Sequence, residues 1–466
     1  GRKTETRRTG PKEWNDFYTV MIGNTTKEIH EPSNDLDRRS TLANAWQQWR
    51  TYFKRDVLTK WRNKQYLLVN ALEAPALAML LAGFMRYVAP GADYTFRHSE
   101  NIPPFLFISV IVALFLGLSV SAEEILRDKS LLKRERFLQA KWHHYVHAKI
   151  AVVASVSLLH AVGFVGVSHL ILELPDFLLA HVAVLFAVSF FGNVLGLVIS
   201  TWFQSAKVIY IIIPLLVIPQ IIFGGAIIRF ERFNPVFTEA DAVPWFGNVM
   251  ASRWGFEALA VDLARNNPYD QELATWDDRI YQASWRRDFW RSEVKRAENQ
   301  EWVDLELTRA AEELSLWSGT DFEWSWKEGG EIQWEEVKDM YNNHYASAFR
   351  SRQQILQEAS AAQDLVALKN ASHNDELWDW VLQNDRQERA IRLDNILIQK
   401  TGPIHRVNDG TNGWNATMYM PYKSLGSATL PTLSFNLLVL ATMAAAMWIL
   451  LLVSPIVSRR WSSRQV

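Results

Sequence analysis

The side chains best suited to chemistry in this chain lie in one charged run, Ser121–Lys149. The run holds eleven Lys, Arg, Asp and Glu residues, and long apolar segments precede and follow it. Charged groups are too costly to leave in hydrocarbon, so we predict that the run is a loop on one face of a membrane. Its apolar residues recur at spacings typical of short amphipathic helices, which indicates an element that docks a partner. The alternative is a solvated loop that reflects only the bias of positive charge toward the cytoplasm.

Motifs for catalysis are missing from the sequence. It has no GxxxxGK[ST] phosphate loop, no LSGGQ-like signature, and no HExxH or GxSxG motif. It has no cysteine, which excludes disulfides and thiolate metal sites. Basic residues gather beside apolar segments and form no nucleic-acid face. We therefore expect no catalytic residue, cofactor or metal on this polypeptide, and no nucleic-acid partner.

Several polar side chains stand inside the apolar segments, where an unpaired polar group is costly and therefore a functional candidate. These candidates are Glu73, Asn193, Gln220, Asn436 and the histidines His160, His169 and His181. Glu73 lies just before Pro75, which can kink a helix. Local pairing with a neighbouring helix explains Glu73 at least as well as a substrate role does. The histidines indicate helix packing, because no two have the close helical spacing of a metal site.

Apolar segments long enough to cross a bilayer define the expected fold. There are six, at about 67–88, 102–122, 150–172, 177–200, 208–228 and 433–457. We predict an all-α polytopic membrane protein with a large, mainly helical insertion between transmembrane helices 5 and 6. The expected divisions are a linker at 1–40, an amphipathic interfacial helix at 41–65, helices 1–5 at 66–228 with the charged loop 121–149, a re-entrant segment at 229–267, a Trp-rich helical domain at 268–429, helix 6 at 430–457 and a tail at 458–466.

The predicted interfacial helix has one apolar face flanked by positive charge. Leu42, Trp46, Trp49, Phe53, Val57 and Trp61 follow helical spacing, and Lys and Arg surround them. Positive charge near the ends of the apolar segments places 1–65, 121–149 and 458–466 in the cytoplasm and 229–429 outside. The chain starts with Gly1 in place of Met, so we expect it to be part of something longer. The outer tryptophans favour core packing over a binding surface.

Several short segments match a pattern of residues in a known family. The segments are KRDVL at 54–58, NKQYLL at 63–68, LEAP at 72–75, SAEEI at 121–125, LKRE at 132–135 and MASRW at 250–254. Together they resemble the membrane domain of G-subfamily ABC exporters, with the closest likeness to bacterial members, often from Bacteroidetes. In that family an acid, an Arg-Glu pair, a Tyr and a Lys mark the loop that couples to the ATPase. Glu124, Arg134, Glu135, Tyr145 and Lys149 match this pattern.

The resemblance implies the permease half of an ABC transporter in a bacterial inner membrane. It implies an ATP-binding cassette partner that carries ATP and Mg, a second membrane half, and a lipid bilayer. The expected ATPase-coupling residues are Glu123, Glu124, Arg127, Asp128, Arg134 and Glu135. The expected translocation-pathway residues are Phe107, Ile111, Phe115, Gln220 and Phe223, for which lipid-facing or packing roles are equally good interpretations.

The outer segment 268–429 has no counterpart in the eukaryotic members, whose outer loop usually carries cysteines. Two other functions therefore stay open. One is a mechanotransmitting protein, in which ATP hydrolysis moves the outer segment against an envelope partner. The other is a channel or scaffold that works without ATP. The identity of any substrate lies beyond the sequence.

Overall fold

The computed structural model divides the chain into two units, residues 1–48 and 49–466. The first unit holds α1 (Pro11–Met21), whose described side chains are exposed, and the start of α2 (Thr41–Arg62). All further description concerns the second unit. The structure describes residues 11–21, 41–88, 90–91, 93–135, 141–175, 177–234, 236–238, 243–297, 302–318, 327–328, 331–362, 364–384, 389–393, 396–406, 413–414 and 416–462.

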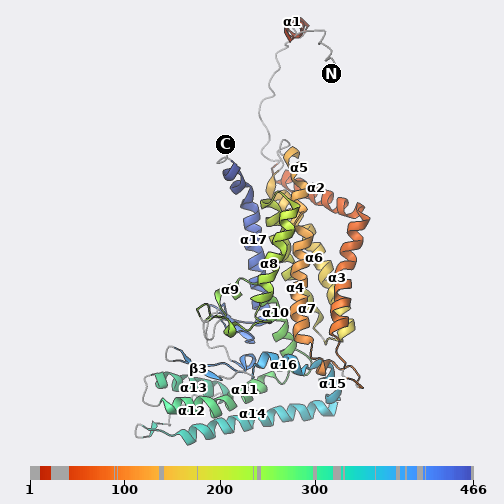
Figure 1. The fold of residues 1–466 in the computed structure, drawn as a ribbon. Helices are drawn as coiled ribbons and strands as arrows, with labels where there is room; N and C mark the ends of the chain where they lie inside the picture. The colour runs from red at the N-terminus through yellow and green to blue at the C-terminus, as the bar shows by residue number, and fades with distance from the viewer. Residues whose placement is uncertain are drawn as a thin grey trace. The chain divides into compact units, whose positions relative to one another are not determined.

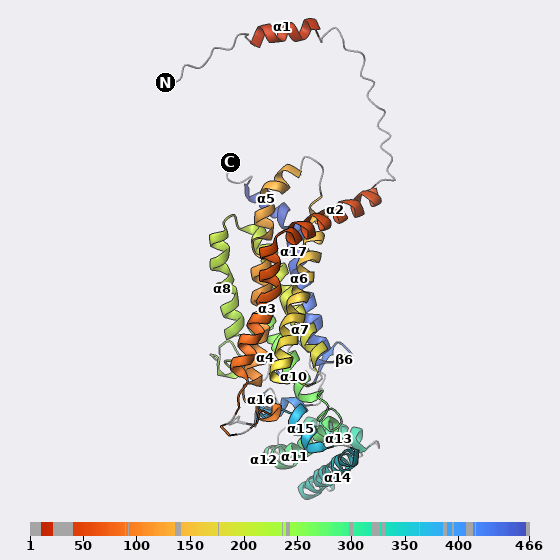
Figure 2. The same cartoon turned by 90° about the vertical axis from the view of Figure 1, so that its right-hand side faces the viewer.

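Long apolar helices run side by side through the second unit (Figures 1 and 2). They are α3 (Lys64–Met85), α4 (Ile102–Ser121), α6 (Trp142–Leu172), α7 (Leu178–Trp202), α8 (Ala206–Ile222) and α17 (Thr432–Ser462). Within the described residues, five helical stretches are long and apolar enough to cross a membrane. The chain is thus a multi-pass membrane protein.

The fifth predicted span is shorter than expected. Instead of covering 208–228, α8 has 17 residues and ends at Ile222. Gly225 follows with φ +78°, a left-handed conformation that suits glycine and ends the helical path. A count of six spanning helices is therefore not established, because α8 falls below the length of the other five.

The centre of the bundle depends on close backbone contact between α4 and α7. A Cβ atom on Gly117 would lie 2.1 Å from the Ser189 carbonyl oxygen, and one on Gly192 would lie 2.7 Å from that of Leu114. Only glycine fits at these two positions, so the helices pack backbone to backbone. By contrast, α3 packs on α6 through the small stripe Ala74, Ala78 and Ala82.

A fully buried helix lies where the bundle meets the outer domain. After η5 (Phe230–Arg232) and α9 (Trp245–Asn248), α10 (Ala251–Arg265) has every residue buried. It contacts α4, α7, α8 and α17 in the bundle and α16 in the outer domain. The segment predicted to be re-entrant therefore contains a central packing element of the second unit.

The outer domain is mostly helical but contains strands that the all-α prediction missed. Its helices are α11 (Ala274–Trp285), the π-helical turn η6 (Arg286–Trp290), α12 (Arg291–Arg296), α13 (Trp302–Ser318), α14 (Trp334–Ala362), α15 (Leu365–Ser372), α16 (Asp375–Leu382) and the 3₁₀ turn η7 (Pro403–His405). Three antiparallel hairpins pair β1 (Lys327–Glu328) with β2 (Glu331–Ile332), β3 (Ala390–Leu393) with β4 (Ile396–Gln399), and β5 (Tyr422–Leu425) with β6 (Ala428–Pro431). Such short hairpins give little periodic signal in a sequence.

Tryptophans form a separate core in the distal part of this domain. Trp285, Trp290, Trp302 and Trp334 are buried in one cluster with Tyr341. The Trp290 indole N–H donates to Glu306 at 3.1 Å, so its polar edge is satisfied. The packing interpretation is confirmed for these four tryptophans.

The two ends of the helix bundle carry different elements. The C-terminal part of α2 and the short helix α5 (Glu124–Glu135) lie at one end, and α11–α16 lie at the other (Figures 1 and 2). The η3 turn (Phe96–His98), between α3 and α4, contacts α15 and α16. Any signal between α5 and the outer domain must therefore pass through the apolar helices.

Candidate functional site

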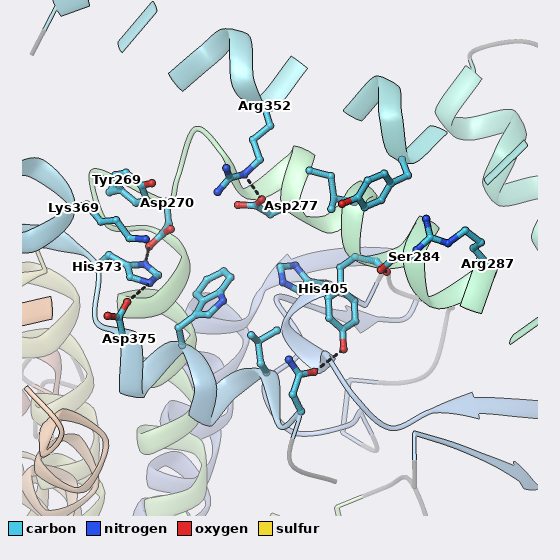
Figure 3. A pocket seen from close by; sticks show the side chains of 16 residues that line it. Tyr269, Asp270, Asp277, Ser284, Arg287, Arg352, Lys369, His373, Asp375 and His405 are labelled. Carbon is cyan, nitrogen blue, oxygen red and sulfur yellow. Dashed lines mark hydrogen bonds and ion pairs between the residues drawn. The ribbon is translucent and has the colours of Figure 1, made fainter. Parts of the chain in front are cut away.

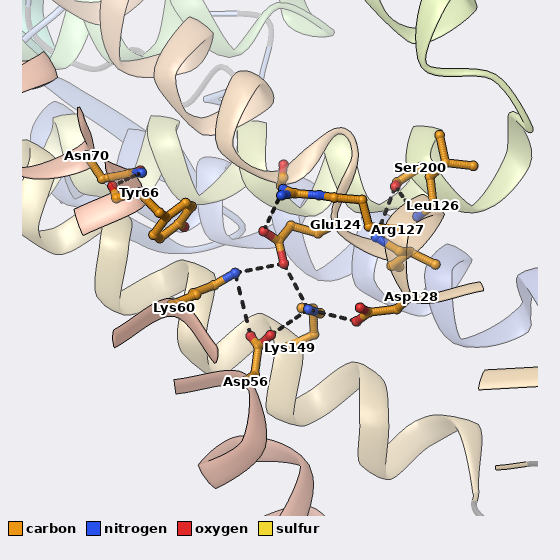
Figure 4. A network of polar contacts seen from close by, with 12 residues as sticks. Asp56, Lys60, Tyr66, Asn70, Glu124, Leu126, Arg127, Asp128, Lys149 and Ser200 are labelled. Carbon is orange, nitrogen blue, oxygen red and sulfur yellow. Dashed lines mark hydrogen bonds and ion pairs between the residues drawn. The ribbon is translucent and has the colours of Figure 1, made fainter. Parts of the chain in front are cut away.

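A network of buried ion pairs joins α2, α5 and α6 (Figure 4). Lys149 on α6 donates to Asp56 on α2 at 2.7 Å and to Glu124 on α5 at 2.8 Å, and its Nζ lies 3.0 Å from Asp128. Lys60 on α2 lies 2.7 Å from the same Glu124 carboxylate. The network thus brings together residues from three separate segments of the chain.

Burial makes the network an obligatory set of contacts. The side chain of Lys149 is only 3% exposed and that of Glu124 only 6%. A charge buried to this degree is strongly destabilising without its partner. Two further groups contact the acidic side chains of the network. Arg127 lies 3.2 Å from Glu124, and the Tyr145 hydroxyl donates to Asp128 at 2.8 Å. The network therefore holds α5 in a fixed position against α2 and α6.

The first turn of α5 is also attached to the end of α7. The Ser200 hydroxyl accepts hydrogen bonds from the backbone N–H groups of Ile125 and Leu126, at 3.1 and 2.9 Å. These donors have no partner within their own helix. Lys129 donates to the Phe203 carbonyl at 2.7 Å. Helix α5 is consequently fixed to α7 as well as to α2 and α6.

Of the six residues predicted to couple to an ATPase, five have described side chains, and these five fall into two groups. Glu124 and Asp128 face the network, where their carboxylates contact residues of this chain. Arg127 and Arg134 are exposed and Glu123 is half-buried. The side chain of Glu135 lies outside the described residues. Contact of any of these residues with an ATPase stays a prediction.

Sequence reasoning did not assign Asp56, Lys60 and Ser200 to this site. Asp56 and Lys60 stand four positions apart on α2, so they share a helix face with Tyr52, whose ring packs against Tyr145 at 5.7 Å. That spacing of opposite charges was a usable signal. Ser200 gave no such signal, because nothing local distinguishes it from other serines in apolar helices.

The residues predicted to line a translocation pathway are largely engaged in packing. The Phe107 ring packs against Phe256 of α10 at 5.5 Å. Gln220 accepts a hydrogen bond from the backbone N–H of Ser252 at 3.0 Å, which anchors the first turn of α10. Phe223 lies in an aromatic cluster with Phe233 and Phe246 (ring centroids at 5.7 and 5.0 Å), and Ile111 is half-buried. Phe115 is 42% exposed. A pathway role for these five residues stays a prediction.

The intramembrane polar candidates Glu73 and Asn193 differ in their surroundings. Asn193 donates through its amide to Ser157, which also pairs with Ser189 at 2.9 Å, so these groups link α6 and α7. Glu73 is half-buried, and no other described residue forms a hydrogen bond or ion pair with it. Local pairing therefore does not explain Glu73 in the described part of the chain.

A second buried network, at the opposite end of the bundle, contains Asn436. Glu257 of α10 accepts from Lys423 of β5, from the Tyr419 backbone N–H at 3.0 Å and from the Asn436 amide at 3.0 Å. Asn436 on α17 also accepts from Lys423 at 3.1 Å. This network fastens β5 and α17 to the buried helix α10. Asn436 thus has a structural place that the sequence did not reveal.

The charged groups of this second network differ in how well they are paired. Arg253 is fully buried, lies 3.5 Å from Glu257 and stacks on the Trp254 ring at 3.7 Å, but no described residue accepts a hydrogen bond from its guanidinium. Burial opposes ionisation of Glu257, but Arg253 and Lys423 outweigh it and lower the pKa of this carboxyl. Burial lowers the pKa of Lys423 to about 7. Glu257 is therefore the anion that the buried Arg253 and Lys423 side chains share, and Lys423 is only partly protonated near pH 7.

Comparison with known proteins gives one family for the region that contains the first network. Residues 47–262 match the family model described as ABC-2 type transporter. The match covers the network residues on α2, α5 and α6 and ends within α10, so it leaves out the outer domain and α17. No curated protein matches the chain. Over these residues the chain is similar to the membrane domain of ABC-2 type transporters.

The first prediction concerns Glu124 and its neighbour. Glu124→Gln removes the anion that Lys60 and Lys149 share, so we expect it to lower the free energy of unfolding by about 3 kcal/mol and to speed hydrogen exchange in α5. Glu123→Gln changes the same group at the half-buried adjacent position, where the amide oxygen can still accept from the Tyr210 hydroxyl, so it should cost clearly less stability than Glu124→Gln. Chemical unfolding in detergent and mass-spectrometric hydrogen exchange measure both. Equal effects of the two variants would contradict the buried network.

The second prediction concerns Glu257. Glu257→Gln leaves Arg253 and Lys423 buried without their shared anion and should cost about 3–5 kcal/mol of stability. Adding Lys423→Met removes one of the two cations and should recover part of the loss. Glu272→Gln, at an exposed position in the outer domain, is the control. Thermal and chemical unfolding of the full chain would test this order of stabilities.

The third prediction is how the stability difference between wild type and Glu257→Gln depends on pH. The Glu257 pKa is lowered from its ordinary value of 4.5. Its carboxylate therefore stabilises the fold fully above pH 4.5, and this contribution is lost as pH falls through the lower folded pKa. The difference in unfolding free energy between wild type and Glu257→Gln should narrow as the pH falls below about 4.5. If the difference in unfolding free energy instead grows as the pH falls, the lowered pKa of Glu257 is contradicted.

Proposed function

We propose that this chain is the membrane half of an ABC exporter, in which ATP hydrolysis by an associated or upstream cassette drives substrate across a bacterial inner membrane by alternating access. The match of residues 47–262 to the ABC-2 type transporter model carries the proposal. The cassette supplies ATP and Mg. In this orientation α5 faces the cytoplasm and residues 229–429 face outward.

The attachment of α5 supports a role as the coupling element. Force on its exposed residues Arg127 and Arg134 passes directly to α2 and α6 through Glu124 and Lys149, and to α7 through Ser200. A loosely held loop would dissipate such a displacement, whereas buried ion pairs transmit it because they tolerate little change in geometry. The exposed charges of α5 are the surface that we assign to the cassette.

A second membrane half is part of the proposal. Apolar side chains on α8 and on one side of α4 are exposed in the single chain, namely Phe115, Ile211, Leu215 and Ile218. Phe115 also belongs to the predicted pathway. A second copy or a related half facing these helices would enclose a pathway between the halves.

Mechanotransmission is the second candidate function. The outer domain has its own buried tryptophan core, and α16 and the η3 turn connect it to α10 and α4. Motion of the bundle would therefore move the outer domain as a body. Deleting the outer domain separates the two candidates, since transport that survives the deletion disfavours mechanotransmission.

The fourth prediction uses the lack of cysteine in the sequence. Single-cysteine variants Arg134→Cys, on α5, and Val366→Cys, on exposed α15, carry the only thiol in the chain. With an impermeant thiol reagent, Val366→Cys should label in spheroplasts and Arg134→Cys only in inverted vesicles. Arg134→Cys should also cross-link to an ATP-binding cassette when thiol cross-linker is added to the membranes.

The unmodified sequence is the control, since it has no thiol and should give no signal. Labelling of both positions from the same side would refute the proposed topology. Failure of Arg134→Cys to cross-link to any cassette would refute the coupling role of α5, even if the topology holds.

A further inference from the structure

The outer domain contains an open pocket of about 540 Å³, far from the α5 network (Figure 3). Its walls come from α11 and α14 on the distal side and from α15, α16 and η7 on the side nearer the membrane helices. Figure 3 shows Asp270, His373 and Asp375 on one side of the pocket and Ser284 and Arg287 on the other. The volume is typical of a site for a small molecule.

Aromatic rings supply the apolar part of the lining. Tyr269, Tyr281, Tyr345 and Trp378 line the pocket, and each is half-buried and keeps part of its surface open. The Tyr281 ring is held in place, because it stacks on His405 at 4.9 Å and its hydroxyl donates to Asn384 at 3.0 Å. Lys369 lies over the Tyr269 ring at 5.5 Å and Arg287 over the Tyr345 ring at 5.3 Å, so a ring-shaped ligand would contact the parts of these rings that stay exposed.

The charged groups in the lining already balance one another. Arg352 donates to Asp277 at 2.6 Å, and Arg97 donates to Asp375 at 3.0 Å. Arg287 pairs with its neighbour Asp288 at 2.6 Å. The Asp270 carboxylate is hydrogen-bonded to His373 at 2.6 Å.

Lys369, on the same side as Asp270, places its ammonium 5.5 Å from the centre of the Tyr269 ring, and with it the lining has three acidic and three basic side chains, the histidines being counted as neutral. A charged ligand would find no unpaired opposite charge in this pocket to offset the free energy of its desolvation. A neutral ligand has a much smaller desolvation free energy.

Hydrogen-bonding capacity nevertheless remains high around the pocket. Carboxylates accept further hydrogen bonds, since each oxygen has more than one lone-pair site, and Lys and Arg side chains carry several N–H donors. The Ser284 hydroxyl donates to the Tyr281 carbonyl at 2.8 Å and can still accept, and the Asn384 amide carries two N–H donors. The pocket thus offers donors, acceptors and aromatic faces together with no net charge to neutralise.

We propose that this pocket binds a neutral saccharide of a few rings at most. Sugar hydroxyls both donate and accept, which suits the mixed polar lining. The C–H face of a sugar ring suits the exposed parts of the Tyr281 and Trp378 rings, which both contact His405, at 4.9 and 5.6 Å. The bound sugar would contact α11, α14 and α16 at once and so bridge the distal and membrane-proximal parts of the outer domain. This inference does not depend on the transport assignment.

The fifth prediction is tested by titrating the full chain, in lipid nanodiscs, with maltotriose, cellotriose and chitotriose by calorimetry. We expect at least one of these neutral trisaccharides to bind at one site per chain. Trp378→Leu should weaken that binding about tenfold, through loss of the aromatic face. Ser284→Trp fills the pocket without removing a charged or aromatic group and should abolish binding.

Leu305→Ala, at an exposed position on α13 outside the pocket lining, is the matched control and should bind like wild type. Unfolding curves of each variant separate loss of the site from loss of the fold. Trigalacturonate and trialanine, as acidic and peptide probes, should bind at least about tenfold more weakly. The proposal is overturned if none of the neutral sugars binds, if Ser284→Trp still binds them, or if an acidic or peptide probe binds as tightly.

Discussion

The organisation of the cytoplasm-facing end that we propose depends on the burial of Glu124 and Lys149. An ion pair this far from water is stable only when every charge in it has a partner. Asp56, Lys60 and Asp128 supply those partners from α2 and α5. The requirement for complete pairing is what forces three helices to converge, and it makes α5 an extension of the bundle.

The opposite end of the bundle also holds a network of buried charged residues that joins separate segments of the chain. Glu257 lies on a helix that is buried on all sides, and it holds β5 and α17 through Lys423 and Asn436. Between the two networks, α4 and α7 meet through glycine with almost no space for side chains. Buried charge fixes the ends of the bundle and close backbone packing fixes its middle.

The outer domain is held together mainly by the packing of aromatic side chains. Tryptophans build its distal core, where the indole N–H of Trp290 donates to Glu306. Its pocket lies between this core and the layer of α15 and α16, where aromatic rings stay partly open. The family match stops before this domain, so its role must be argued from its own chemistry.

The sequence by itself determined the apolar helices, the charged run between two of them and the lack of catalytic motifs, because hydrophobic length and charge density are local properties of a chain. The local pattern overestimated the length of α8, which ends at Ile222, and it did not predict the short hairpins. Only the tertiary structure decided which acid meets which base. Asp56 and Lys149 are separated by 93 positions, and nothing in the spacing of either residue indicates the other. Their pairing follows from the packing of α2 on α6, and packing is a property of the whole fold.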